Sequence, residues 1–257
     1  MHTPVNHPLP THLSTNLIET RTDLPANPEP GNYVVVDVMF FSTTVVELLA
    51  NGATHVHVTE ERGEEFAYRE HNPRAKLGGS RTSHYTPTEG YDFFNSPSYV
   101  QSVDVEGRSV SMTSKNGGRA VTDLRDAGGP DVDVYVGGTT NAAALGHWLR
   151  EDDRPTYLVS AGSKGEPAIE DHLGAVLVSR HLHGVPVSDV ETELYARLLD
   201  VAKGVDYVNE HETRRRDVRE FVAAFDSRTV VPRVDGDRLV DATRTGRDAP
   251  AGANATR

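Results

Sequence analysis

The sequence predicts a three-layer α/β fold, with helices on both faces of a largely parallel sheet. Strand-like and helix-like segments alternate between residues 31 and 240, which is typical of parallel sheets. Residues 33–38 read Tyr-Val-Val-Val-Asp-Val, a nearly continuous β-branched run that indicates a strand buried on both faces. Several of these strands run into loops rich in glycine and hydroxyl residues, the position at which parallel sheets bind ligands.

The individual elements follow from their local patterns. Strands are predicted at residues 33–38, 55–58, 77–79, 108–113, 132–136, 157–159, 229–232 and 238–240. Ser42 or Thr43 is expected to cap the first helix, which Asn51-Gly52 ends. Further helices are predicted at 60–71, shortly after 118, and at 141–150, 169–183, 190–203 and 209–224.

The domain organisation is predicted as one α/β domain over residues 31–240. Six prolines in residues 1–30 indicate a flexible N-terminal arm, and residues 241–257 are expected to form a disordered tail. Asp37-Val38 with Thr43-Thr44 parallels Asp133-Val134 with Thr139-Thr140. This short repeat leaves open an internal duplication with halves 31–125 and 126–240.

Charge and composition exclude several classes of protein. The chain has 38 acidic and 26 basic residues, a formal charge of −12, which disfavours binding to nucleic acid. No apolar run approaches the roughly 20 residues that span a bilayer, and no secretory signal begins the chain, so we expect a cytoplasmic protein without a membrane partner. The chain has no cysteine, which excludes thiolate chemistry. The sequence leaves the oligomeric state open, with a homodimer as one alternative.

Four loops are predicted at the carboxyl ends of strands, at residues 37–44, 78–81, 114–119 and 160–171. Their small residues allow backbone N–H groups to approach an oxyanion, as helix N-termini do. The same loops carry four cations, Arg81, Lys115, Arg119 and Lys164. Together they predict a site for a small phosphate or sulfonate, although any one of these loops taken alone is better explained as a plain turn or cap.

Three carboxylates are the strongest candidates for chemistry. Asp37 ends an otherwise apolar strand, where an unpaired charge costs several kcal/mol. Either a metal ion or basic partner offsets that cost, or Asp37 caps the following helix, and both interpretations stay open. Glu170 and Asp171 open a helix, where acids are favoured by the helix dipole, but they also suit Mg²⁺.

The chain also resembles a known family, the 2-phosphosulfolactate phosphatases, which are Mg²⁺-dependent hydrolases of coenzyme M biosynthesis. Seven segments in register carry the resemblance: VVVDVMFFSTTVVELLANGA (34–53), LGGSR (77–81), GYDFFNSP (90–97), SMTSKNGGRAV (111–121), GTTNAAAL (138–145), SAGSKGEPAIEDHLGA (160–175) and TVVPRVDGDRL (229–239). The resemblance implies an α/β phosphomonoester hydrolase that releases phosphate from a small anionic 2-phospho acid. A paralogue that binds such an anion without turnover is the alternative.

The resemblance also implies roles for individual residues. It makes Asp37, Asn116, Arg119, Glu170 and Asp171 catalytic, with Asp37, Glu170 and Asp171 holding the metal. The implied substrate-binding residues are Ser42, Thr43, Thr44, Arg81, Asn95, Lys115, Gly117, Asn141, Ser163 and Lys164. This sequence has Phe40 where the family has arginine and Ser80 where it has an acid, and Lys115 is the candidate to replace the missing positive charge.

The charge pattern generates a prediction about salt. Only four of the 26 basic residues are lysines, and acid excess with few lysines is the composition of proteins from a high-salt cytoplasm. At 1 M salt the Debye length is about 3 Å, which screens repulsion among the surplus acids. We therefore expect the melting temperature to rise between dilute buffer and several-molar KCl in a calorimetric scan. A melting temperature independent of KCl would contradict salt adaptation.

Overall fold

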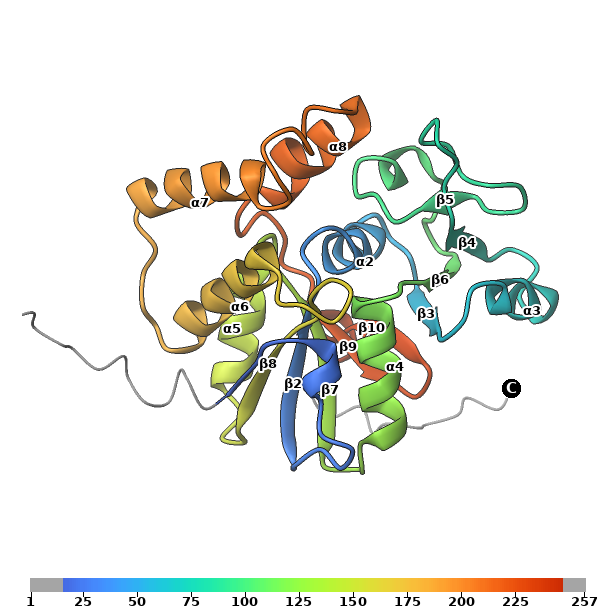
Figure 1. Cartoon of the computed structure of the whole chain (residues 1–257). Coiled ribbons are helices and arrows are strands. Elements are labelled where there is room, and N and C mark those ends of the chain that lie inside the picture. The colour runs from blue at the N-terminus through green and yellow to red at the C-terminus, as the bar shows by residue number, and fades with distance from the viewer. Residues whose placement is uncertain (1–15, 247–257) are drawn as a thin grey trace, which may run out of the picture.

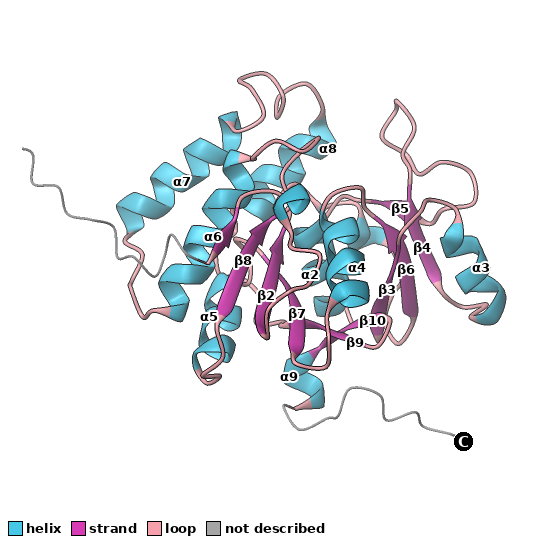
Figure 2. Ribbon diagram, turned by 60° about the horizontal axis from the view of Figure 1, so that its bottom comes forward, coloured by secondary structure: helices cyan, strands magenta, loops and turns pink. Residues whose placement is uncertain are grey.

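A computed structural model describes residues 16–246 of the chain. Ten strands form one mixed sheet in the order β1-β8-β2-β7-β9-β10-β3-β6-β4-β5 (Figure 2). The strands are β1 (Leu17–Ile18), β2 (Gly31–Val36), β3 (His55–Thr59), β4 (Lys76–Gly79), β5 (Phe93–Phe94), β6 (Ser109–Thr113), β7 (Val132–Gly137), β8 (Thr156–Ser160), β9 (Pro232–Asp235) and β10 (Arg238–Asp241).

The sheet consists of two parallel groups joined by one hairpin. Strands β1, β8, β2 and β7 are mutually parallel, and so are β3, β6, β4 and β5. The hairpin β9–β10 lies between the groups and pairs antiparallel with β7 on one side and β3 on the other. The predicted α/β class with a largely parallel sheet is confirmed.

Helices cover both faces of the sheet, as Figures 1 and 2 show. The α-helices are α2 (Phe41–Ala50), α3 (Glu64–His71), α4 (Gly117–Ala127), α5 (Ala142–Arg150), α6 (Ile169–Leu182), α7 (Asp189–Val201), α8 (Glu212–Arg216) and α9 (Ala242–Thr245). Short 3₁₀ turns cover Arg21–Asp23 and Val100–Ser102, and a π-helical turn covers Asp217–Val222.

Strand β2 lies at the centre of the layered core. Its side chains alternate, so that Tyr33 and Val35 pack in one apolar cluster with α2 and α4, whereas Val34 and Val36 pack in the other with α5 and α6. All four residues are buried. The unbroken run of apolar residues in β2 thus reflects burial on both faces, as predicted.

Three local predictions were wrong. Helix α2 begins at Phe41, and neither Ser42 nor Thr43 caps it, because the Ser42 hydroxyl accepts the N–H of Asp37 instead. The strand predicted at 229–232 lies instead at Pro232–Asp235. The N–H of Val231 donates to the side chain of Asp241 and its carbonyl accepts the N–H of Ala242, so Val231 is not paired as part of a strand. The helix predicted over 209–224 divides into α8 and the π-helical turn.

Parts of the predicted N-terminal arm and C-terminal tail have regular secondary structure. Within the predicted arm, residues 17–18 form β1 beside β8, while residues 1–15 lie outside the described residues. Within the predicted tail, α9 covers residues 242–245, and residues 247–257 lie outside the described residues. A division at residue 125 does not separate the two parallel groups, since β2 pairs with both β7 and β8.

The hairpin predicts where the fold is most sensitive to substitution. Leu239 of β10 is fully buried between the two parallel groups. We expect Leu239→Ala to lower the free energy of unfolding by about 2–5 kcal/mol, because it leaves a cavity in a close-packed core. Leu194→Ala on the exposed side of α7 is the matched control, with an expected change within about 0.5 kcal/mol. Urea denaturation measures both, and equal losses would contradict this role of the hairpin.

Candidate active site

The turn from β2 into α2 places Asp37 against the N-terminus of α4. The Asp37 carboxylate Oδ2 accepts the N–H of Gly117 at 2.9 Å, although 80 residues separate them in the sequence. A side chain at Gly117 would clash here, since an added Cβ would lie 2.5 Å from the ring of Phe41 and 2.6 Å from Cβ of Asp37. Glycine at this position therefore allows the loop after β2 to approach the N-terminus of α4.

Asp171, in the first turn of α6, joins two more loops. Its Oδ1 accepts the N–H of Val38 at 2.8 Å, and its Oδ2 accepts the N–H of Gly162 at 3.0 Å. Val38 follows β2 and Gly162 follows β8, which is the neighbouring strand. A single buried carboxylate thus fixes the loops at the carboxyl ends of two adjacent parallel strands.

Glu170, beside Asp171 in α6, pairs with a lysine that follows α7. The Nζ atom of Lys203 lies 2.5 Å from Oε1 of Glu170, and the Glu170 side chain is 2% exposed. Lys203 also interacts electrostatically with Asp171 and Asp37. Three buried carboxylates therefore interact with one ammonium group, and Glu170 contacts it directly. We call Asp37, Glu170, Asp171 and Lys203 the acid cluster.

The electrostatics of the acid cluster show an excess of negative charge. Burial raises the pKa of Asp37. The Gly117 N–H and the Lys203 ammonium favour the charged carboxylate, but they offset this effect only in part. Burial and then the Asp37 and Glu170 carboxylates raise the pKa of Asp171 well above its usual value. Burial alone disfavours a charged Lys203, yet Glu170, Asp171 and Asp37 together raise the pKa of its ammonium. One lysine does not balance three acids.

The predicted hydroxyl residues lie in α2 beside this cluster. Ser42 accepts the N–H of Asp37 at 2.9 Å, and the Thr43 hydroxyl donates to the carbonyl of Val38 at 3.0 Å. Both hydroxyls therefore fix the loop that carries Asp37. The Thr44 hydroxyl is buried and has no hydrogen-bond partner within residues 16–246.

Other predicted residues have structural partners elsewhere. Arg119 pairs with Glu60 at 3.0 Å and Asp123 at 2.9 Å, and is not brought to the acid cluster. Asn141 is buried, accepts the N–H of Gly138 and donates to the carbonyl of Val230, which fixes the loop after β7.

Four further predicted residues belong to turns. Ser163 and Lys164 belong to a tight turn closed by bonds between Ser163 and Glu166. Asn116 precedes α4, and Lys115 next to it is exposed. No contact of the Lys115 side chain with residues 16–246 supports it as the substitute cation.

Arg81 and Asn95 lie together at a separate cavity of about 360 Å³ at the ends of β4 and β5. The Arg81 guanidinium stacks on the ring of Tyr85 at 3.8 Å. Tyr207 connects this region with the acid cluster, since its hydroxyl interacts electrostatically with both Lys203 and Arg81.

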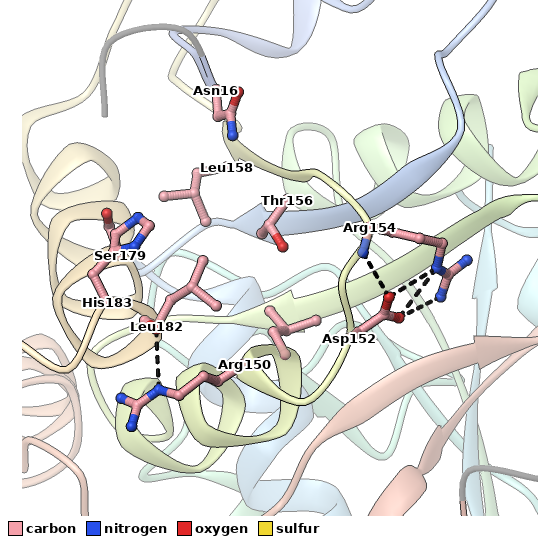
Figure 3. Close-up of a pocket in the computed structure, with 10 residues that line it drawn as sticks. Asn16, Arg150, Asp152, Arg154, Thr156, Leu158, Ser179, Leu182 and His183 are labelled. Atoms are coloured by element: carbon pink, nitrogen blue, oxygen red, sulfur yellow. Dashed lines mark hydrogen bonds and ion pairs between the residues drawn. The ribbon is translucent and has the colours of Figure 1, made fainter. Parts of the chain in front are cut away.

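Figure 3 shows a different cavity, of about 250 Å³, between α5, α6 and β8. Its charged groups are satisfied within the fold. Arg154 contacts Asp152 and Arg150 donates to the carbonyl of Leu182, as the dashed lines mark. The cavity is lined by Thr156, the first residue of β8, and so lies at the end of the strand opposite to the loops that carry the acid cluster. The Figure 3 cavity therefore does not share the chemistry of the site.

The metal prediction is tested by the arrangement of donors. Within residues 16–246, no three His, Asp or Glu side chains form a group that could hold a metal ion by themselves. Both oxygens of Asp171 accept backbone N–H groups, which leaves Asp37 and Glu170 as the better donors. Mg²⁺ commonly binds through only one or two carboxylates, with waters and substrate phosphates completing its coordination. The carboxylates of the cluster fit a metal held in this way.

Fold and site together define an α/β protein with a buried acid cluster where parallel strands end, a class typical of enzymes acting on small ligands. Residues 18–222 match the model of the 2-phosphosulpholactate phosphatase family, and the chain belongs to that family of phosphoric monoester hydrolases. Of the helices within residues 16–246, none is both long and apolar enough to cross a bilayer.

Several relatives carry the name probable 2-phosphosulfolactate phosphatase. One from Symbiobacterium thermophilum is 34% identical over 62% of this chain and 66% of its own length. One from Clostridium perfringens is 28% identical over 74% of this chain and 71% of its own. One from Deinococcus radiodurans is 31% identical over 68% of this chain and 70% of its own.

Lys203 is the member of the cluster that the sequence analysis did not single out as a site residue. It ends a predicted helix and lies 33 residues after Glu170 in a chain that has only four lysines. That scarcity was the one available signal, because nothing local indicates that Lys203 faces three acids.

The charges predict a pH-dependent effect of removing this lysine. We expect Lys203→Met to lower the free energy of unfolding by about 3 kcal/mol at pH 8, since it leaves buried carboxylates unpaired. Without the ammonium the folded-state pKa values of Asp37 and Asp171, which Lys203 lowers, rise further. Stability is then lost as pH rises from the unfolded to the folded pKa, so the deficit is smaller at pH 5. Urea denaturation at both pH values measures it.

The control is Arg74→Met, which removes an exposed arginine that has no ion pair within residues 16–246. It should change stability by less than about 0.5 kcal/mol at either pH. A Lys203→Met deficit equal at pH 5 and pH 8 would show that Lys203 does not balance the acids.

Proposed function

We propose that this protein is a Mg²⁺-dependent phosphomonoester hydrolase that releases phosphate from a small anionic 2-phospho acid. The observation that carries the proposal is the acid cluster, in which Asp37, Glu170 and Asp171 are buried at the carboxyl ends of β2 and β8. Membership of the phosphatase family supports the reaction class.

In this proposal the acids have different tasks. Asp37 and Glu170 would hold Mg²⁺, which when bound offsets the charge that spreads over the phosphoryl oxygens. Asp171 keeps the loops at Val38 and Gly162 in place through its two backbone hydrogen bonds. Lys203 pairs with Glu170 and holds its side chain in position beside the site.

The raised pKa values support the need for a further cation. A buried carboxylate with a raised pKa is poorly compensated in its charged form. Asp37 and Asp171 both have raised pKa values even with Lys203 present. A divalent ion would supply the missing positive charge and, through it, attract a phosphate dianion into a chain that is acidic overall.

A second function is that the chain binds a small organic phosphate or sulfonate without hydrolysing it. The pairing of Glu170 with Lys203 favours this alternative, because an internal cation already occupies one of the donors. Phosphate release from a panel of small phosphomonoesters, with and without Mg²⁺ in several-molar KCl, separates the two. Mg²⁺-dependent turnover selects the hydrolase, and thermal stabilisation by the esters without turnover selects the binder.

The hydrolase predicts a large effect at Asp37. We expect Asp37→Asn to reduce phosphate release by at least about a hundredfold, which is in the range of losing a group that acts directly in the reaction. Asp237→Asn in the exposed turn between β9 and β10 removes the same charge and should leave the rate unchanged. Activity retained in a folded Asp37→Asn variant, as judged by circular dichroism, would remove Asp37 from the mechanism.

A further inference from the structure

The cavity beside β4 and β5 is lined by two arginines from different loops. Arg62, Ser80, Arg81 and Asn95 contribute to its wall, and its volume is about 360 Å³. Arg62 follows β3, Arg81 follows β4 and Asn95 follows β5. These three strands run parallel within one group of the sheet, so the loops at their carboxyl ends converge at one edge.

Arg62 lacks a carboxylate partner within residues 16–246, although the neighbouring residues are acidic. Glu60 and Glu61 both pair with Arg119 instead. The buried carboxylate of Glu65 accepts the N–H of Gly63 at 2.7 Å and the hydroxyl of Tyr91 at 3.3 Å, and it also bonds to Thr113. Glu60, Glu61 and Glu65 are therefore committed to other donors.

Arg81 likewise forms no ion pair within the described residues. Its guanidinium stacks on Tyr85 at 3.8 Å and donates one bond, at 3.2 Å, to the carbonyl of Thr82. Stacking holds the planar group in place and leaves further N–H donors available for an anion. In a chain with 38 acids and 26 bases, two unpaired arginines on one cavity stand out.

Asn95 adds an acceptor to the same wall. Its side-chain Oδ1 is buried and has no hydrogen-bond donor within residues 16–246. An unpaired buried acceptor is unfavourable, and a hydroxyl on a bound ligand would satisfy it. The wall thus offers two guanidinium groups for an oxyanion and one acceptor for a hydroxyl.

We propose that this cavity binds a small oxyanion that carries a hydroxyl group, such as monohydrogen phosphate or the acidic end of a hydroxy acid, and that Arg62 is one of its ligands. Arg–oxyanion pairs form charge-assisted and frequently bidentate bonds. The anion could be the far end of the proposed substrate or a separate ligand, and both sources share this chemistry. The binding itself does not depend on the proposed hydrolysis.

The test is the affinity of the full chain for orthophosphate, measured by isothermal titration calorimetry in the Asp37→Asn background without Mg²⁺. Removing the metal and Asp37 separates the cavity from the acid cluster. We expect Arg62→Met to weaken phosphate binding at least tenfold, as the loss of a hydrogen bond to a charged group does. Arg74→Met, which removes another exposed arginine at a different cavity, should bind phosphate unchanged.

Two results would overturn the proposal: no phosphate binding to the parent chain, or equal affinity in Arg62→Met and Arg74→Met. Kinetics distinguish the two sources. A raised KM with unchanged kcat in Arg62→Met, only for phosphomonoesters with a second anionic group, supports the far end of the substrate. Weakened phosphate binding with unchanged KM supports a separate anion. An Asp37→Asn variant that loses turnover but still binds phosphate would show that binding at the cavity does not depend on the proposed hydrolysis.

Discussion

The site depends on backbone N–H groups that are held by buried carboxylates. Asp171 accepts the N–H groups of Val38 and Gly162, and Asp37 accepts that of Gly117, so three loops are fixed by two side chains. A buried carboxylate needs such donors because burial otherwise favours its neutral form. The loops that follow β2, β8 and β6 therefore occupy the positions that these acids impose.

The sequence predicted the fold better than the contacts of the site. The apolar run of β2 identified a doubly buried strand, and the acid at its end identified Asp37, because both signals are local. Arg119 was expected at the phosphate, but its charge is taken by Glu60 and Asp123. Lys203 went unnoticed for the same reason, since the pairing of charges far apart in the chain is decided by packing and not by local pattern.

The acidic residues of this chain are compensated differently at the surface and in the interior. Surface acids such as Asp123 and Glu60 pair with arginines in solvent, where each pair contributes about 0–1 kcal/mol and is screened by salt. The acids of the cluster are buried, where bulk salt does not screen them, and their charge is compensated by backbone N–H groups and by the Lys203 ammonium. Adaptation to salt can therefore change the surface without changing the electrostatics of the site.

The connection between α7 and α8 is the structural link between the two candidate regions. Lys203 reaches Glu170 of α6, and four residues later Tyr207 lies 4.3 Å from the guanidinium of Arg214. Arg214 in turn lies 5.3 Å from the ring of Tyr85, which stacks with Arg81. In Figure 1 this connection and the loops around β5 lie at the same end of the molecule. A displacement of one short segment would therefore disturb both the acid cluster and the arginine-lined cavity, which gives the α7–α8 region a role in the site although it lies outside the sheet.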